Sequence, residues 1–239
     1  MSDPKTLWRY MPLVALIRLL QTKTLYLARS DLFEDVLEGQ FGFSVMVDHV
    51  GLSNRPQFAK VVDALKAECF LSCWYFAETE NFAMWEIYGK EPSSIAIACR
   101  PMSVMNVAND FCTRKEYYGM VGQVKYDDLI INGKLDVSTL LLPFGRTSIT
   151  VPKPAQAFYC KDSAYAHENE WRLLIWRRKA SQTSVSLPIS DIATFVERIL
   201  VSPRASDWTV ESVRELVQLQ FGFNGISVEK SKLVTHFRA

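Results

Sequence analysis

The sequence predicts an α+β fold, with a central mixed or antiparallel β-sheet flanked by helices. Short apolar segments with the period of a strand are mixed irregularly with fewer helical segments, which is typical of this class. Of the 239 residues, 49% are hydrophobic and 12% are aromatic, so the chain can bury a substantial core. The sequence contains no repeats and no low-complexity linkers. We therefore expect a single globular domain over residues 1–239.

The first part of the chain is predicted to begin with a strand, a helix and a second strand. The strands cover residues 6–10 and 24–28, and the helix between them covers 12–21 and begins near a proline, which suits a first helical turn. The acidic segment 30–39 is expected to form a loop with a short helical turn. A helix over about 56–68 follows, because apolar residues recur there at helical spacing: Phe58, Val61, Val62 and Leu65.

The rest of the chain is predicted to supply further strands and three more helices. The strands are expected at 69–75, 94–99, 117–126, 170–177, 183–187, 197–202 and 226–229. The helices are expected at 81–88, at 102–110, and from Ser206 or Asp207 to near Gly222, where a polar N-cap and a glycine mark the two ends. Residues 127–157 are rich in proline and turn residues, so we expect a long excursion there.

The charge balance indicates which partners the chain could attract, and the number of cysteines indicates its cellular compartment. The 27 basic and 26 acidic side chains give a net charge of +1, so no overall field attracts nucleic acid or an anionic membrane. Arg9 and Arg18 interrupt the N-terminal apolar stretch, which is too short to span a membrane and has no small-residue cleavage site. The five cysteines show no metal-binding spacing. Their odd number favours reduced thiols and a cytoplasmic protein.

Sequence motifs for several common chemistries are missing. The chain has no phosphate-binding loop, no dinucleotide fingerprint, no zinc-binding helix and no nucleophile elbow. Their absence argues against P-loop hydrolysis, hydride transfer on a doubly wound sheet and serine hydrolysis. Polar groups placed within apolar segments then remain as the candidates for a site.

The most informative of these segments reads Glu168, Asn169, Glu170, Trp171 and Arg172. If it is extended, its period of two places Glu168, Glu170 and Arg172 on one face of a strand. Two carboxylates on one face repel each other unless a cation, a sugar hydroxyl or a substrate lies between them. The pattern leaves two interpretations open: a functional site, or an edge strand in which Arg172 pairs with Glu170. Trp171 is expected in the core.

Five sequence blocks resemble a known bacterial family. LWRYM, LYLARSDLFEDVLEG, CFLSCW, ENFAMWEIYG and ENEWRLL occur in this order between residues 7 and 174. They are similar to the bacterial domain-of-unknown-function 2971 family, in which an acidic N/E-D-P-x-E loop, an MWxxY helix and a closing E-x-E-W/Y-R recur. Val36 stands where that loop usually has proline. The family label implies no activity.

The order of the polar residues also resembles the arginine, serine, E-x-E series of ADP-ribosyltransferases. The resemblance implies that Arg9 and Ser72 contact NAD, the substrate, and that Tyr75 or Trp74 stacks on nicotinamide. Glu170 would stabilise an oxocarbenium-like transition state, and Glu168 would orient or deprotonate an acceptor. Tyr88, on the predicted helix 81–88, would flank the cleft. The implied protein is an NAD-dependent transferase or NAD-cleaving enzyme, with a protein or nucleic acid as acceptor.

Two further functions stay open from the sequence. A metal-dependent nuclease would hold magnesium between the acidic loop, at Glu34 and Asp35, and the pair Glu168 and Glu170. A non-catalytic module would bind a ligand or a partner in a toxin or phage-defence context. The two glutamates and the aromatic residues would then be structural, since an aromatic stripe on a helix is more often core than ligand cradle.

Overall fold

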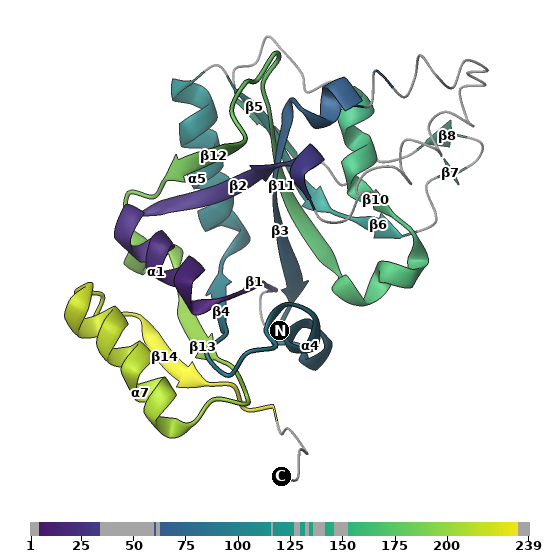
Figure 1. The fold of residues 1–239 in the computed structure, drawn as a ribbon. Coiled ribbons are helices and arrows are strands. Elements are labelled where there is room, and N and C mark those ends of the chain that lie inside the picture. The colour runs from purple at the N-terminus through teal and green to yellow at the C-terminus, as the bar shows by residue number, and fades with distance from the viewer. Residues whose placement is uncertain are drawn as a thin grey trace. The chain divides into compact units, whose positions relative to one another are not determined.

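A computed structural model describes residues 5–33, 60, 63–115, 117–126, 130–131, 134–135, 142–145 and 153–233. Its chain divides into two compact units. Unit 1 comprises residues 1–25, 74–104 and 188–239, and unit 2 comprises residues 26–73 and 105–187. Figure 1 shows the elements along the chain. Helices and a mixed sheet occur together, so the predicted α+β class is confirmed.

Unit 1 is built around antiparallel strands with one parallel pair. Its strand order is β14, β13, β4, β1 and the second half of β3, and only the contact of β13 with β14 is parallel among these described pairs. The strands are β1 (Thr6–Met11), β3 (Cys69–Ala77), β4 (Ile95–Cys99), β13 (Arg198–Val201) and β14 (Ser227–Lys230). Each lies within two residues of the sequence-based prediction at both ends.

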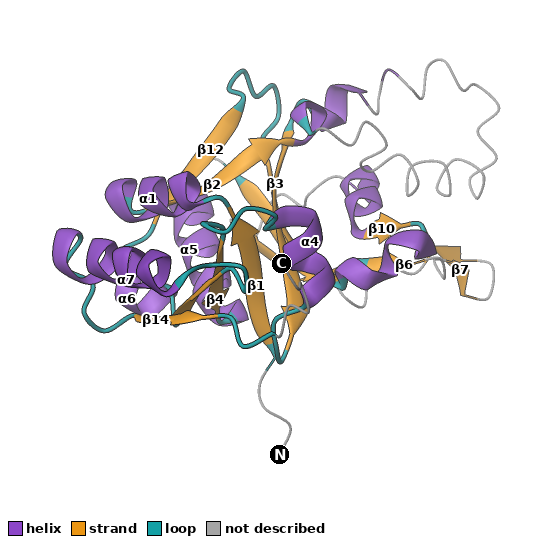
Figure 2. Cartoon of the chain, turned by 60° about the horizontal axis from the view of Figure 1, so that its bottom comes forward, coloured by secondary structure: helices purple, strands orange, loops and turns teal. Residues whose placement is uncertain are grey.

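The helices of unit 1 are short, with at most ten residues each. They are α1 (Leu13–Thr22), α4 (Phe82–Tyr88), α6 (Ile192–Phe195) and α7 (Asp207–Glu215). A π-helical segment, η5 (Leu216–Gln220), continues α7, and Gly222 follows it with a φ of 74°. The predicted long C-terminal helix is thus an α-helix with a π-helical end. Figure 2 shows α7 beside β14.

Unit 2 contains the other part of the sheet. In strand order, the first half of β3 is followed by β11 (Glu170–Trp176), β5 (Tyr118–Gln123) and β9 (Leu142–Gly145). The strand β2 (Thr24–Arg29) pairs with β3 and with β12 (Ser184–Pro188). The helix α5 (Pro101–Arg114) begins in unit 1 and ends in unit 2, and it is four residues longer at its end than predicted.

The predicted excursion at 127–157 contains short elements. Two strands, β7 (Ile130–Ile131) and β8 (Lys134–Leu135), form an antiparallel pair, and a 3₁₀ helix, η3 (Lys153–Tyr159), ends the segment. The strand predicted over 117–126 is divided at Val124 into β5 and β6 (Lys125–Tyr126). The strand β6 leaves the main sheet and pairs in parallel with β10 (Cys160–Lys161). Within the described residues, no helix is long and apolar enough to cross a membrane.

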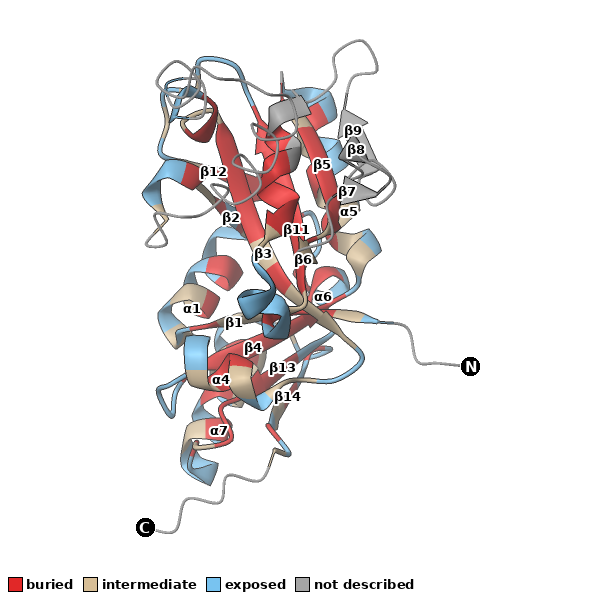
Figure 3. Cartoon of the chain, turned by 90° about the vertical axis from the view of Figure 1, so that its right-hand side faces the viewer, coloured by how far each residue is buried: buried red, intermediate tan, exposed pale blue. Residues whose placement is uncertain are grey.

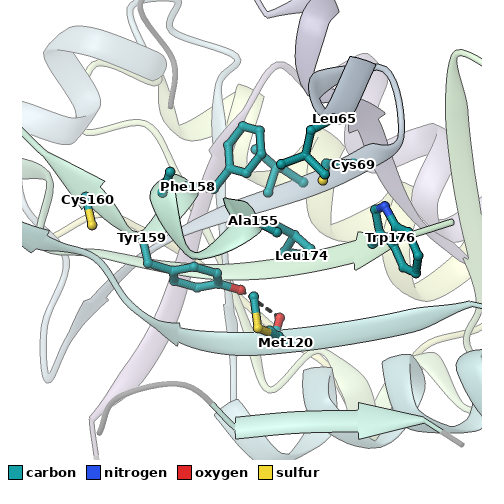
Figure 4. Packing of buried hydrophobic residues seen from close by; sticks show 11 residues of the cluster. Leu65, Cys69, Met120, Ala155, Phe158, Tyr159, Cys160, Leu174 and Trp176 are labelled. Carbon is teal, nitrogen blue, oxygen red and sulfur yellow. Dashed lines mark hydrogen bonds between the residues drawn. The ribbon is translucent and has the colours of Figure 1, made fainter. Parts of the chain in front are cut away.

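The core of unit 2 surrounds β11, which is buried along its whole length (Figure 3). Leu174 and Trp176 of β11 pack with Phe158 and Tyr159 from η3. The Tyr159 hydroxyl donates a hydrogen bond to the Met120 carbonyl at 2.8 Å, as the close view in Figure 4 shows. Because β11 lies between β3 and β5, it is a central strand. The edge-strand interpretation of the E-x-E segment is therefore wrong.

Trp85 of α4 anchors the helix in unit 1. Its ring is completely buried and meets Tyr10 edge-on at 5.0 Å, and its Nε1 donates to Glu80 at 2.7 Å. Gly89 follows the helix directly, and its amide donates to the Trp85 carbonyl at 2.9 Å. A Cβ at position 89 would lie 2.5 Å from Trp85 Cε3. Only glycine therefore lets the chain turn against this ring.

We expect Gly89→Ala to lower the free energy of unfolding by about 1–3 kcal/mol, because the methyl group must push a packed indole ring aside. Gly225→Ala is the matched control in the same unit, since a Cβ there meets nothing within 4 Å. It should change stability by no more than about 0.5 kcal/mol. Urea unfolding of both variants tests this, and equal stability of the two would contradict the packing described for Trp85.

Candidate functional site

The six predicted site residues divide between the two units. Ser72, Glu168 and Glu170 belong to unit 2, and Arg9, Tyr75 and Tyr88 belong to unit 1. The two glutamates lie together with cationic side chains from two elements, β10 and β11. We call this group of Lys161, Glu168, Glu170 and Arg172 the carboxylate cluster.

The backbone turns sharply between the two glutamates. Glu168 ends the 3₁₀ helix η4 (Ser163–Glu168), which Asp162 caps by accepting a hydrogen bond from the Ala164 amide at 2.8 Å. Asn169 then adopts the left-handed conformation, with φ 36° and ψ 55°, and β11 begins at Glu170. Asparagine tolerates this conformation better than most residues. The segment is therefore not extended at Asn169, so the condition under which Glu168 would share a strand face with Glu170 and Arg172 is not met, and the strand begins at Glu170 as predicted.

Lys161 nevertheless brings the two carboxylates together. Its Nζ lies 2.6 Å from Glu168 Oε2 and 3.3 Å from Glu170 Oε2. All three side chains are largely buried, with 13%, 8% and 7% of their surface exposed for Lys161, Glu168 and Glu170. Of the cation, sugar hydroxyl or substrate that could lie between two neighbouring carboxylates, the structure shows a cation, and it is a lysine of the chain itself. Lys161 also lies over the Tyr165 ring, at 5.1 Å from its centroid.

Arg172 holds the second carboxylate from the same strand. Its Nε and Nη2 each donate to Glu170 at 2.8 Å, one to each oxygen, and its Nη1 donates to the Phe158 carbonyl. Arg172 is completely buried. The predicted pairing of Arg172 with Glu170 is confirmed, as is the burial of Trp171. A bidentate arginine fixes the plane of the Glu170 carboxylate.

These contacts keep Glu170 ionised. Burial alone would raise its pKa, but the charge and the hydrogen bonds of Arg172, with smaller contributions from Lys161 and the Cys73 thiol, lower the pKa to about 2. The Glu170 amide donates to the Tyr126 hydroxyl at 2.9 Å. Burial raises the pKa of Tyr126 to about 12, so this phenol stays protonated at neutral pH. The Glu170 carboxylate is therefore ionised at neutral pH and lies between two cations, Lys161 and Arg172.

Ser72 lies on the other side of its strand. Neighbouring residues of a strand point to opposite faces, and the Cys73 thiol is the group on β3 that hydrogen-bonds to Glu170. Ser72 therefore points away from the face of β3 that meets the carboxylate cluster. It is buried within unit 2. Its predicted role as an NAD contact stays a prediction.

The predicted site residues of unit 1 lie among aromatic side chains. The Arg9 guanidinium lies 5.6 Å from the ring centroid of Trp74, whose buried Nε1 has no hydrogen-bond partner among the described residues. The Tyr75 hydroxyl accepts a hydrogen bond from Asn81 Nδ2 at 3.0 Å. Tyr88 is 48% exposed at the end of α4, whereas Trp85 is buried. The helical stripe predicted from Trp85 and Tyr88 thus places one of its two rings in the core.

The nuclease interpretation has less support. Glu34 and Asp35, two of its proposed ligands, lie outside the described residues. Within the described part of the chain, no group of three or more histidine, cysteine, aspartate or glutamate side chains could hold a metal ion. Glu168 and Glu170 instead share the Lys161 ammonium. Across the same described ranges, none of the five cysteines forms a disulfide, and four of them are buried.

Sequence reasoning missed Lys161, Tyr126 and Cys73 as neighbours of the glutamates. Lys161 lies only seven residues before Glu168, and two neighbouring buried carboxylates require a cation, so a search for the nearest lysine was an available signal. Tyr126 and Cys73 are 44 and 97 residues before Glu170, and strand pairing alone brings them there.

Comparisons with known proteins give low-similarity structural matches. No protein-family model matches the chain, and no curated protein matches it. The chain is similar to Thermus sp. 2.9 DarT in complex with NAD+, with 12% identity, a TM-score of 0.42 and 97% of each chain covered. DarT from the same source with carba-NAD+ gives 12% identity, a TM-score of 0.40 and coverage of 97% and 98%. DarT from this source in complex with ADP-ribosylated ssDNA gives 11% identity and a TM-score of 0.38, with 91% of this chain and 89% of that chain covered.

Alignments at these TM-scores do not establish a common fold. Membership of the domain-of-unknown-function 2971 family stays a prediction, since no family model matches.

Proposed function

We propose that this protein cleaves the bond between nicotinamide and ribose in NAD and passes ADP-ribose to water or to a macromolecular acceptor. The observation that carries the proposal is the state of Glu170. This carboxylate is largely buried, is oriented by a bidentate arginine, and has a pKa lowered to about 2, with a second carboxylate beside it. Such a group suits a reaction in which positive charge develops on a sugar.

The chemistry follows from the charges. When the C1′–N1 bond of NAD breaks, its electron pair leaves with neutral nicotinamide, and positive charge develops on C1′ and the ring oxygen of the ribose. A carboxylate that is already ionised and oriented stabilises this charge without reorganisation. The acceptor oxygen or nitrogen then forms the new bond to C1′ and loses a proton. Glu168 is the neighbouring base for that proton.

The roles of the other residues belong to the same proposal. Arg172 orients Glu170 and does not itself meet the substrate, because it is completely buried and already donates to Glu170 and Phe158. Arg9, Ser72, Tyr75 and Tyr88 remain the residues predicted to contact NAD. A cytoplasmic toxin or defence effector is the setting that this activity would suit, since its substrate NAD is abundant inside cells.

The reaction is tested by incubating the purified protein with NAD in excess EDTA and measuring free nicotinamide and ADP-ribose by mass spectrometry. We expect nicotinamide to be released without any divalent metal. Products that contain ADP-ribose should appear in equal amount, either free or attached to an added protein or nucleic acid. If NAD neither raises the melting temperature nor loses nicotinamide with any acceptor, the proposal is wrong. Metal-dependent cleavage of nucleic acid would instead favour the nuclease.

A further inference from the structure

We propose that Lys161 is a positioning residue that keeps Glu168 and Glu170 ionised together and holds their carboxylates in place for the reaction. This inference rests on the proposed function for its catalytic consequence. Its physical basis is the pair of contacts from one ammonium, at 2.6 Å to Glu168 and 3.3 Å to Glu170. No role for Lys161 follows from the arginine, serine, E-x-E pattern.

Among the described residues, four other groups lie around the pair, and each of them has a contact of its own there. From β11, Arg172 is committed to Glu170 through two hydrogen bonds and to the Phe158 carbonyl through a third. From β6, the Tyr126 hydroxyl accepts a hydrogen bond from the Glu170 amide, and the phenol is neutral. From β3, the Cys73 thiol donates to Glu170 and carries no charge as a donor. From η4, Tyr165 presents its ring to Lys161 itself.

Two carboxylates in a largely buried place repel each other when no cation lies between them. Without Lys161, the two carboxylates would lose the ammonium that contacts both of them, while the donors of Arg172 face Glu170 and the Phe158 carbonyl. The pair would then bind a proton at a higher pH than it does in the wild type. A protonated carboxyl group can neither stabilise positive charge on the ribose nor accept the proton of the acceptor. The activity of a protein without Lys161 would therefore decrease as the pH is lowered.

The lysine is also held firmly enough to define the position of the pair. It is the second residue of β10 and lies in register with Tyr126 of β6. This two-stranded sheet therefore presents Lys161 and Tyr126 on the same face, toward Glu168 and Glu170. Lys125 and Cys160 are the preceding pair in register, so their side chains point to the opposite face.

The test compares Lys161→Met, Lys161→Arg and Lys125→Met in nicotinamide release from NAD between pH 5.5 and 8.5, an interval of about three pH units. We expect the wild type and Lys125→Met to show the same profile. Lys161→Met should lose at least about tenfold in kcat at the acid end relative to the alkaline end. Lys161→Arg should restore the wild-type profile. An unchanged pH profile in a folded Lys161→Met protein would overturn the inference.

A second measurement does not depend on NAD. The ¹³C resonances of the glutamate side-chain carboxyls in the ligand-free protein report protonation directly, and Lys161→Gln is a second neutral variant if Lys161→Met does not fold. We expect one carboxyl of the pair to titrate at higher pH in the variant than in the wild type. Identical titrations would overturn the inference. If the titration moves but the wild type releases no nicotinamide, the proposed function fails and the charge-holding role of Lys161 stands.

Discussion

Arg172→Met is expected to lower the free energy of unfolding by about 3–5 kcal/mol. The substitution keeps an unbranched apolar chain in a completely buried position but removes three hydrogen bonds, two to Glu170 and one to the Phe158 carbonyl. Glu170 is then left as a buried carboxylate with Lys161 as its remaining cation. Removing one partner of a buried ion pair is costly because the other charge stays desolvated.

Arg178→Met is the matched control for this prediction. Arg178 is the second residue after β11 and is exposed, so the same change of side chain should alter stability by no more than about 0.5 kcal/mol. Chemical denaturation at pH 7 compares the two variants with the wild type. If Arg172→Met were as stable as Arg178→Met, the bidentate pairing with Glu170 would contribute nothing to the fold.

Acid is expected to remove the stability that Glu170 contributes. A carboxyl group whose pKa is lower in the folded state stabilises the fold above its ordinary pKa, and the contribution disappears as pH falls through the folded value. The pKa of Glu170 falls from 4.5 to about 2, which corresponds to about 3 kcal/mol. This contribution is complete above about pH 5 and is lost between pH 4.5 and 2.

Other carboxylates also titrate in this range, so the informative quantity is the difference between the wild type and Glu170→Gln. We expect the wild type to exceed the variant in free energy of unfolding by about 3 kcal/mol more at pH 6 than at pH 2. Unfolding by urea at several pH values gives this difference. A gap that does not depend on pH would show that Glu170 titrates in the folded protein as it does in the unfolded chain.

The sequence was most informative where side-chain periodicity decides the structure. Alternation along 170–176 predicted a strand in which Trp171 lies in the core and Arg172 pairs with Glu170. The structure confirms the burial of Trp171 and the ion pair. Both faces of this strand are buried because it lies in the middle of the sheet. The helix α4 was also predicted within one residue. Its Asn81 cap, whose side chain accepts from the Ala83 amide at 2.7 Å, is a local signal.

Contacts that depend on a single backbone angle or on long-range pairing could not be predicted in this way. Because Asn169 is in the left-handed conformation, Glu168 lies outside the strand, and the presence of an asparagine alone does not predict such a turn. The division of the predicted strand 117–126 at Val124 places Tyr126 on a separate small sheet with Lys161. The candidate site was therefore predicted in its two carboxylates, while the cation between them was not.

The central claim is that the Glu170 carboxylate acts on NAD, and the rate of nicotinamide release by Glu170→Gln tests it most directly. Enzyme in excess over NAD gives a single turnover, and circular dichroism at the assay temperature confirms that the variant is folded. Glu68→Gln is the control. Glu68 accepts a hydrogen bond from Trp176 Nε1, and Trp176 lies at the other end of β11, about 20 Å from Glu170 along the strand. We predict that Glu170→Gln is slower than the wild type by at least about 100-fold, while Glu68→Gln keeps the wild-type rate. Release of nicotinamide by folded Glu170→Gln at the wild-type rate would contradict the claim.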